Sequence, residues 1–336
     1  INIYDEKIYK KARENLKNMI DNGILIKDEK ECLYIYRQSM GDHVQTGIAG
    51  CVSIDDYIND IIKKHEETRK DKEDDRIKHV YYCNANTGPI FLTYKAKDEI
   101  DNIVELWTAE HKPVYDFVAE DEIRHTVWII DDDTINKLIE KFKTVDFLYI
   151  ADGHHRAASA VEVGKMKRKE KPDYNGQEEF NYFLGVLFPH NELKIMDYNR
   201  VIKDLNGYCS GDFLKKIGEK FDIEEYKGKG GYRPENRSIF GMYLNNKWYK
   251  LMPKKGIFNA HDLIDSLDVS ILQNNILGPI LGIIDPRSDK RIDFVGGIRG
   301  LEELERRVNN GMAVAFSMFP TTVEDIMNIA DENKTM

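Results

Sequence analysis

The chain has 336 residues, of which 41% are hydrophobic and 32% charged. This balance is typical of globular domains, and the length favours two of them. With 49 Lys and Arg against 59 Asp and Glu, the formal net charge is -10. That charge argues against broad nucleic-acid binding, which needs a concentrated basic surface. Because no apolar stretch approaches the roughly 18 residues of a membrane span, we expect no membrane partner.

The termini and the cysteines bear on the type of protein. The chain begins at Ile1 rather than Met, so we expect that an N-terminal part is missing, and its first residues do not form a signal peptide.

The four widely spaced cysteines form no C-x-x-C pair of a zinc or thioredoxin-like site; they are Cys32, Cys51, Cys83 and Cys209. We interpret them as reduced thiols and expect a cytoplasmic protein. An oligomer is left open.

The N-terminal third predicts helices around a pair of strands. Residues 4–21 predict a helix that ends before Asn22-Gly23. Residues 32–38 and 45–51 predict two strands joined by a turn. A helix is expected to begin at Ser53, and its apolar stripe follows helical spacing. If it continues to residue 76, the same inward face carries His65, Arg69, Lys72 and Arg76.

The middle of the chain alternates strands and helices. Strands are expected at 90–94, 126–130 and 145–151, and helices at 100–106 and 133–142. This alternation predicts an α+β (mixed α/β) sheet domain over residues 1–180.

The C-terminal part of the chain has a different sequence pattern, with a charged segment followed by expected hairpins. Residues 165–179 are rich in charge, which predicts a surface loop at a domain edge. Hairpins are expected over 183–198 and over 239–251, where Asn245-Asn246 forms the turn. A helix is expected at 323–330. We therefore predict a second α+β domain over residues 181–336.

The motif that carries most chemistry is Asp152-Gly153-His154-His155-Arg156, between an apolar run and a small-residue helical stretch. A strand, a glycine turn and a helix start form a natural anion site, because free backbone N–H groups point outward there. The histidines and the arginine can donate hydrogen bonds to phosphate, and Gly153 permits close approach. Asp152 is an anion, so it suits Mg²⁺ or a substrate hydroxyl better. A helix cap with surface histidines, or a metal site at His154 and His155, is the alternative.

A second constellation is KKHEETRKDKEDDR at 63–76, whose charges nearly cancel. Cations on an inward face indicate an anionic ligand, which makes His65, Arg69, Lys72 and Arg76 candidate cofactor ligands; a solvated helix is the alternative. Glu66 lies about 100° from His65 on a continuous helix. A catalytic role for Glu66 would be easier if the helix broke between His65 and Arg69.

Other patterns are weaker. His125 and Trp128 start a strand and fit packing, and Asp285–Asp289 predicts a turn. The chain has no G-x-x-x-x-G-K-[ST], G-x-G-x-x-G, H-E-x-x-H or G-x-S-x-G motif. A nucleotide would therefore bind through a phosphate-binding element other than these motifs.

ADGHHR at 151–156, KKHEETRKDKEDDR at 63–76 and DFVGG at 293–297 resemble family 1015 of the domains of unknown function, over essentially the whole chain. That family is similar to the ParB/sulfiredoxin superfamily, whose phosphate-binding element is G-x-x-R before a helix, as in Gly153–Arg156. The resemblance implies a ParB/sulfiredoxin-like nucleotide-binding domain in residues 1–180. Sulfiredoxins carry a catalytic cysteine where this chain has His154, so their sulfinic-acid chemistry is not implied.

The free-serine kinases of the superfamily also carry D-G-H-H-R and an upstream H-E, matched here by His65-Glu66. The resemblance implies that Glu66 is the general base, that Asp152 positions the hydroxyl or Mg²⁺, and that His154, His155 and Arg156 hold the phosphates. The expected activity is transfer of phosphate from ATP or ADP to free L-serine or a similar small hydroxyl compound. A ParB-like nucleotide-binding regulator is the alternative, and a nucleic-acid-processing protein is a third.

Overall fold

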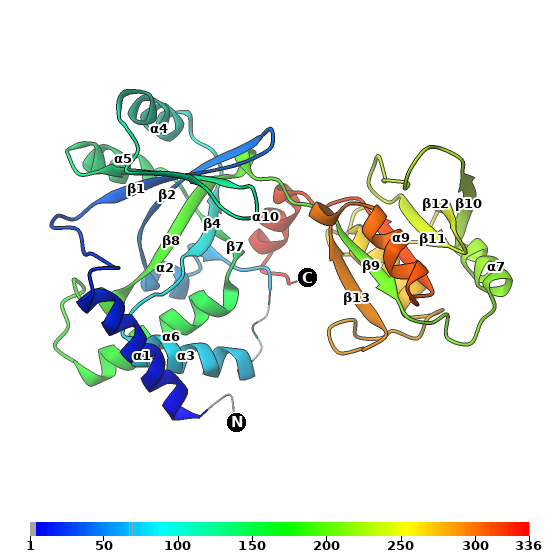
Figure 1. The fold of residues 1–336 in the computed structure, drawn as a ribbon, viewed down its shortest axis with the longest axis horizontal. Coiled ribbons are helices and arrows are strands. Elements are labelled where there is room, and N and C mark those ends of the chain that lie inside the picture. Colours follow the sequence, from blue (N-terminus) through cyan, green and yellow to red (C-terminus); the bar gives the residue numbers. More distant parts are fainter. Residues whose placement is uncertain (1–4, 67, 69, 336) are drawn as a thin grey trace. The chain divides into compact units, whose positions relative to one another are not determined.

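The computed structural model of the protein describes residues 5–66, 68 and 70–335. These residues belong to two compact units, which are coloured along the chain in Figure 1. The first unit comprises the residues up to Leu193 and those from Ala330 onward, and the second runs from Lys194 to Ile329. The chain therefore leaves the first unit after Leu193 and returns to it at Ala330.

The first unit is built on a mixed eight-stranded sheet of order β3-β7-β4-β8-β2-β1-β6-β5. Its strands are β1 (Leu33–Met40), β2 (His43–Ser53), β3 (Ile62–Lys63), β4 (Ile90–Tyr94), β5 (Tyr115–Val118), β6 (Arg124–Ile130), β7 (Leu148–Asp152) and β8 (Tyr182–Pro189). The division between the units lies beyond the predicted one at 180/181, because β8 is part of this sheet.

Helices cover both faces of the first sheet. They are α1 (Glu6–Asp21), α2 (Ile54–Ile58), α3 (Lys70–Cys83), α4 (Asp98–Glu110), α5 (Thr134–Phe142) and α6 (His154–Glu170), with short 3-10 turns η1 (Glu179–Asn181) and η2 (His190–Glu192). Figure 1 shows α4 and α5 on one side of the sheet and α3 and α6 on the other. Within the part of the chain that the structure describes, none of the helices has the length and apolar composition that a membrane crossing requires.

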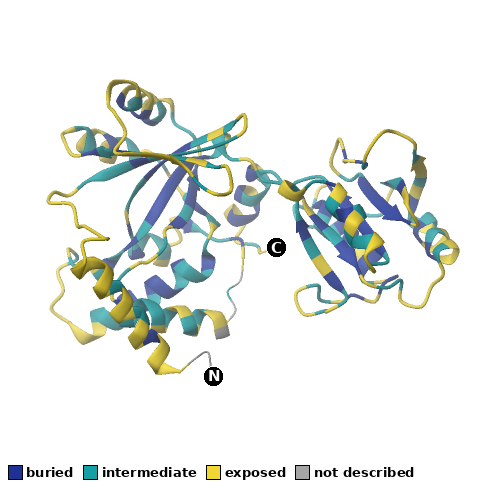
Figure 2. Ribbon diagram, viewed as in Figure 1, coloured by how far each residue is buried: buried dark blue, intermediate teal, exposed yellow. Residues whose placement is uncertain are grey.

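The core of the first unit is apolar on both sides of the sheet. Figure 2 shows the central strands as mostly buried, with exposed residues on the outer surfaces of the helices. Leu92 of β4 and Ile150 of β7 are fully buried, together with Ile100 of α4 and Ala157 of α6. This double-sided burial fixes the position of β7, whose end carries the D-G-H-H-R motif.

The second unit has a six-stranded sheet of order β10-β12-β11-β14-β9-β13. Its strands are β9 (Tyr198–Ile202), β10 (Phe221–Tyr226), β11 (Phe240–Leu244), β12 (Lys247–Pro253), β13 (Ile292–Gly296) and β14 (Val314–Met318). Its helices are α7 (Ser210–Lys220), α8 (Asp268–Leu272), the π-helical turn η3 (Gln273–Leu277), η4 (Gly297–Arg299), α9 (Glu302–Asn309) and α10 (Val323–Asp331), the last of which ends in the first unit.

Alternate side chains of β14 enter two separate cores. Phe316 belongs to the cluster that contains Phe213 and Ile217 of α7, whereas Ala315 belongs to the cluster that contains Leu304 of α9. Successive strand residues point to opposite faces, so a fully apolar strand needs cover on both sides. The predicted α+β class with two α+β units is therefore confirmed.

The helices, hairpins and loops expected from the sequence can be compared one by one with those of the structure. The first helix and the 239–251 hairpin are confirmed, and both hairpin asparagines have positive φ, 52° at Asn245 and 60° at Asn246. The expected 183–198 hairpin is wrong, because β8 pairs within the first sheet and β9 within the second. The loop expected from residue 165 is also shorter, since α6 continues to Glu170.

Candidate functional site at the start of helix α6

The short strand β3 brings the two sequence motifs together. β3 runs parallel to β7, with Ile62 opposite Leu148 and Lys63 opposite Tyr149. The carboxyl ends of parallel strands meet at one edge of a sheet, so His65 and His154 emerge side by side. The two rings lie edge to face, with centroids 4.5 Å apart and planes at 88°. Both side chains are buried, at 6% and 4% exposure.

This arrangement corrects the expected continuous helix. Helix α2 ends at Ile58, Asp60 has a φ of 55°, and α3 begins only at Lys70. His65 therefore lies in a connection between strand and helix, and the helical stripe from Ile54 to Arg76 does not exist. The break comes earlier than between His65 and Arg69, and it frees Glu66 from helical geometry.

Glu66 reaches the D-G-H-H-R turn. Its Oε2 lies 3.5 Å from Nδ1 of His154, and its side chain is 55% exposed. A carboxylate that is half in water and beside a buried imidazole can contact both a ligand from solvent and the histidine. The question that the sequence left open, whether Glu66 can approach the motif, is thus answered by the β3–β7 pairing.

The glycine turn is set by close packing. Gly153 has φ 97° and ψ 31°, a left-handed conformation that favours glycine. A Cβ at this position would lie 2.9 Å from both Nε and Nη2 of Arg156. Helix α6 starts directly after the turn at His154 and runs for 17 residues. Its first backbone N–H groups and the positive end of its dipole therefore face the same space as the motif side chains.

Arg156 folds back onto Asp152. Its Nη2 donates a 2.6 Å hydrogen bond to Asp152 Oδ2, and the side chains are 40% and 73% exposed. A pair this exposed contributes little stability, so a phosphate can replace the carboxylate at small cost. Among the described residues, no three His, Cys, Asp or Glu side chains are grouped to hold a metal. Asp152 alone would have to share Mg²⁺ with phosphate oxygens and water, as Mg²⁺ commonly permits.

Both histidines are neutral at neutral pH. Burial lowers the pKa of His65 to about 4. Burial, and then the neighbouring His65 and His155, lowers the pKa of His154 to about 3. The contact between Glu66 and His154 is therefore carboxylate to neutral imidazole rather than an ion pair.

The neutral state assigns a tautomer to His154. A carboxylate oxygen 3.5 Å from Nδ1 favours a proton on Nδ1, because two lone pairs would repel. The other nitrogen, Nε2, then carries a lone pair and can accept a hydrogen bond. A ligand O–H group suits that atom, whereas a phosphate oxygen suits it only after the ring takes up a proton.

Three buried polar atoms at this site have no hydrogen-bond partner among the described residues: His65 Nδ1, His154 Nε2 and Arg156 Nε. Buried polar atoms are nearly always paired, and leaving one unpaired costs about 1–3 kcal/mol. Three such atoms around one helix start indicate a place that a ligand completes.

The remaining predicted residues have different positions. Lys72 and Arg76 are exposed on α3, and Arg69 lies outside the described residues. His155 is half-buried, and its carbonyl accepts a 2.6 Å hydrogen bond from Ser159 Oγ, which also contacts the carbonyl of Glu73 on α3. The ligand roles of these residues stay predictions.

Sequence reasoning missed the turn that precedes β4. A Cβ on Gly88 would lie 3.9 Å from Cδ of Arg156, so this turn flanks the arginine. Its signal was the Gly88-Pro89 pair before a strand. Two cavities of about 260 and 340 Å³ in the first unit are lined by other residues. The α6 site is recognised by its unpaired polar atoms.

Comparisons with known proteins give a match to one protein family. The sequence model of a family described as "Protein of unknown function (DUF1015)" matches residues 2–270. A search among curated proteins found no match.

Eight solved chains match, and two of them serve as examples. One is a free serine kinase variant in complex with AMP, with 12% identity, a TM-score of 0.42, and 85% of this chain and 83% of that chain covered. The other is C-terminally truncated SbnI from Staphylococcus aureus, with 10% identity, a TM-score of 0.42, and 86% and 79% covered.

Proposed function

The chain belongs to the DUF1015 family, and from that premise and the geometry at the start of α6 we propose that it is a phosphotransferase that uses ATP or ADP. The proposed acceptor is free L-serine or a similar small hydroxyl compound. The observation that carries the proposal is the set of three unpartnered buried polar atoms around one helix start. The donor and the acceptor come from the resemblance of the two motifs to those of free-serine kinases.

The phosphate side of the proposed site is the α6 N-terminus. Its backbone N–H groups and the fork of Arg156 can neutralise phosphate oxygens, and Gly153 lets the phosphate approach the backbone closely. Asp152 would hold Mg²⁺ together with phosphate oxygens, and the ion would neutralise charge on the transferring group.

The acceptor side is the pair of Glu66 and His154. The acceptor oxygen forms a bond to phosphorus while the bond from phosphorus to the leaving nucleotide breaks, and the hydroxyl proton passes to the Glu66 carboxylate. The neutral ring of His154, oriented through Nδ1 by Glu66, offers Nε2 as an acceptor for a second ligand O–H group. Both groups thus suit a hydroxyl compound rather than another anion.

The proposal also includes the cellular compartment in which the protein acts. Cys32, Cys51, Cys83 and Cys209 are free thiols in the structure, which suits a reducing compartment. We place the reaction in the cytoplasm.

The direct test is incubation of the protein with Mg²⁺, L-serine, and either ATP or ADP, followed by mass spectrometry for O-phosphoserine. We expect Glu66→Gln to lower turnover by about 10²–10⁴-fold, which is the usual contribution of a general base. Its nucleotide affinity should stay unchanged, because Glu66 contacts the acceptor side. Glu29→Gln, an exposed glutamate elsewhere in the first unit, is the matched control.

Two results would contradict the proposal. One is the absence of a phosphorylated product from serine and from a panel of small alcohols with either nucleotide. The other is full turnover by Glu66→Gln, which would remove that residue from the mechanism. Nucleotide binding without any small-molecule product would instead support the ParB-like regulator.

A further inference from the structure

A separate cavity of about 260 Å³ lies at the other end of β4. Phe91, near the start of β4, pairs with Asp152 of the α6 site, whereas Tyr94, at the end of β4, lines the cavity. Three residues at about 3.4 Å each place the two ends about 10 Å apart along the strand. The cavity therefore does not belong to the α6 site.

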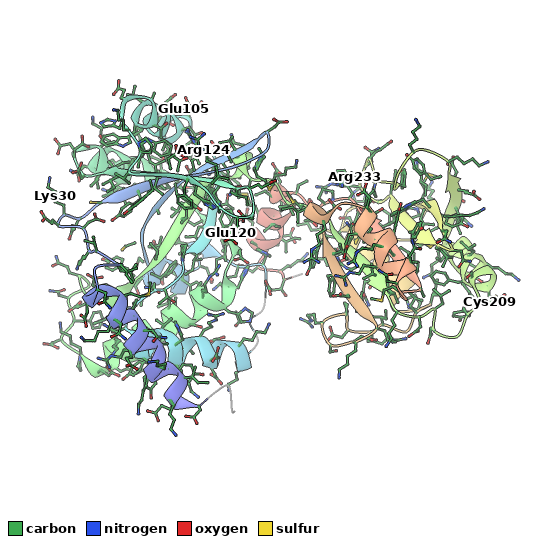
Figure 3. All side chains as sticks on the ribbon, viewed as in Figure 1. Lys30, Glu105, Glu120, Arg124, Cys209 and Arg233 are labelled. Carbon is green, nitrogen blue, oxygen red and sulfur yellow. The ribbon has the colours of Figure 1, made fainter. Side chains whose placement is uncertain are left out.

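Carboxylates from two elements line this cavity. Asp101 and Glu105 are one turn apart on α4, and Glu192 comes from η2 after β8. Figure 3 labels Glu105 on α4. The backbone N–H of Thr46 donates a hydrogen bond to Glu192 Oε2. In the part of the chain that the structure describes, the side chains of Asp101 and Glu105 have neither an ion pair nor a hydrogen bond, although like charges one turn apart repel.

One cation, Arg37 of β1, lines the same cavity. Its Nε donates to Thr46 Oγ1 at 3.0 Å and its Nη2 to Thr108 Oγ1 at 3.3 Å. Its guanidinium carbon lies 5.0 Å from the ring centroid of Trp128. These contacts hold the planar group in place. They leave Nη1 without a hydrogen bond and Arg37 without an ion pair, as far as the described residues extend.

Opposite charges therefore line one cavity without pairing with each other. Burial raises the pKa of Asp101 and that of Glu192, and each is raised further by neighbouring acidic groups. Arg37 is close enough to lower the pKa of Glu192 but forms no ion pair with it. A fixed guanidinium and carboxylates that stay apart leave room for a ligand with both signs of charge.

We propose that this cavity binds an amino acid with a second amino group, such as a lysine-like diamino acid. Its carboxylate would meet Arg37 Nη1, and its two ammonium groups would meet Asp101, Glu105 and Glu192. Three carboxylates against one guanidinium make the cavity lining net negative, which favours a ligand with a net positive charge. The volume is below the roughly 300–1,000 Å³ of pockets for drug-sized molecules, which suits a small metabolite, and Val44, Ile48 and Val104 can contact its methylene chain. The inference does not depend on the proposed phosphotransferase activity.

The test compares three probes by titration calorimetry without nucleotide: L-lysine, L-norleucine, which lacks the second amine, and cadaverine, which lacks the carboxylate. We expect L-lysine to bind at least about tenfold more tightly than either. Arg37→Gln and Asp101→Asn should each weaken L-lysine binding by about tenfold or more. Glu99→Gln removes an exposed carboxylate of α4 outside the cavity and should leave the affinity unchanged.

A second measurement needs no ligand. Asp101→Asn removes the repulsion between Asp101 and Glu105 one turn away, so its melting temperature without ligand should rise while L-lysine binding weakens. Equal affinity for all three probes would overturn the proposal, as would unchanged L-lysine affinity in both cavity variants. Since O-phosphoserine formation is measured separately, failure of either proposal is recognised independently.

Discussion

Two buried polar clusters, one in each unit, differ in how completely their hydrogen bonds are made. In the second unit, buried Asp197 accepts hydrogen bonds from Asn199 Nδ2 at 2.6 Å, from Arg233 Nη1 at 2.9 Å and, at its carbonyl, from Gly297 at 2.7 Å. In the first unit, His65, His154 and Arg156 each keep an unpaired buried nitrogen.

The difference separates a structural role from a ligand site. Both clusters contain a glycine that makes room for a charged side chain: a Cβ on Gly297 would lie 2.2 Å from Asp197 Oδ1, and one on Gly153 would lie 2.9 Å from Arg156 Nε. Sequence motifs alone do not distinguish these cases, since DFVGG and DGHHR both mark glycine turns. The completeness of the hydrogen bonds distinguishes the two cases, because a network in which every buried polar group is paired needs no further partner.

The largest expected effect is at the complete cluster. Asp197→Ala removes the acceptor of the hydrogen bonds from Asn199 Nδ2 and Arg233 Nη1 and should destabilise the second unit by about 1–3 kcal/mol, because the buried amide of Asn199 loses its partner. Hydrogen exchange of β9 and β14 amides, followed by mass spectrometry, measures the loss. Asp222→Ala, at an exposed position of β10, is the control. Equal protection in the two variants would mean that the Asp197 network is not structural.

A smaller effect is expected at the incomplete cluster. Gly153→Ala forces alanine into a left-handed conformation at a cost of about 1–2 kcal/mol and also displaces Arg156. Gly176→Ala is a matched control, because Gly176 has a similar φ of 92° and no atom within 4 Å of the added Cβ. Both variants should lose similar stability, but only Gly153→Ala should weaken ADP binding, by about tenfold. The same ADP affinity in both would exclude Arg156 from the phosphate site.

The effect expected to be smallest near neutral pH is a dependence of stability on pH. The pKa of His154, about 3, lies below the roughly 6.5 of an unfolded histidine, so the unfolded chain binds more protons in between. Stability is therefore full above about pH 6.5 and falls as the pH drops toward 4, by at most about 1.4 kcal/mol per pH unit for each such histidine.

His154→Asn should reduce this slope in the first unit, and His43→Asn, at a half-buried position at the start of β2, should not. Urea denaturation can follow the first unit alone through Trp107 and Trp128 in a Trp248→Phe background, since the chain has three tryptophans. An unchanged slope in His154→Asn would mean that the ring is not held neutral by burial.

Local patterns predicted much of the first unit. The strand, glycine turn and helix around Asp152–Arg156 formed as expected because a buried apolar run, a glycine with φ 97° and small helix-forming residues agree with one another. The apolar run at 90–94 likewise became β4 without a shift of its ends. Such segments carry their own signal and need no knowledge of distant partners.

Pairing between distant segments could not be predicted. The two residues of β3 are too few for a strand pattern, yet their parallel pairing with β7 delivers Glu66 to His154. The helical stripe from Ile54 continued into His65 by coincidence, and tertiary pairing overrode it. The cavity around Arg37 could not be predicted either, since its charged residues come from three separate segments of the chain.

The return of the chain to the first unit at Ala330 has a consequence for synthesis. Tyr149 beside β3 donates a 2.8 Å hydrogen bond to Asp331, across 182 positions of sequence. The ribosome adds roughly 5–20 residues per second, so residues 194–329 take on the order of ten seconds to appear before Asp331 does. During that interval the nascent first unit lacks its closing contact, and the second unit is complete just before that contact can form. The second unit is in this sense an insertion that the first must wait for.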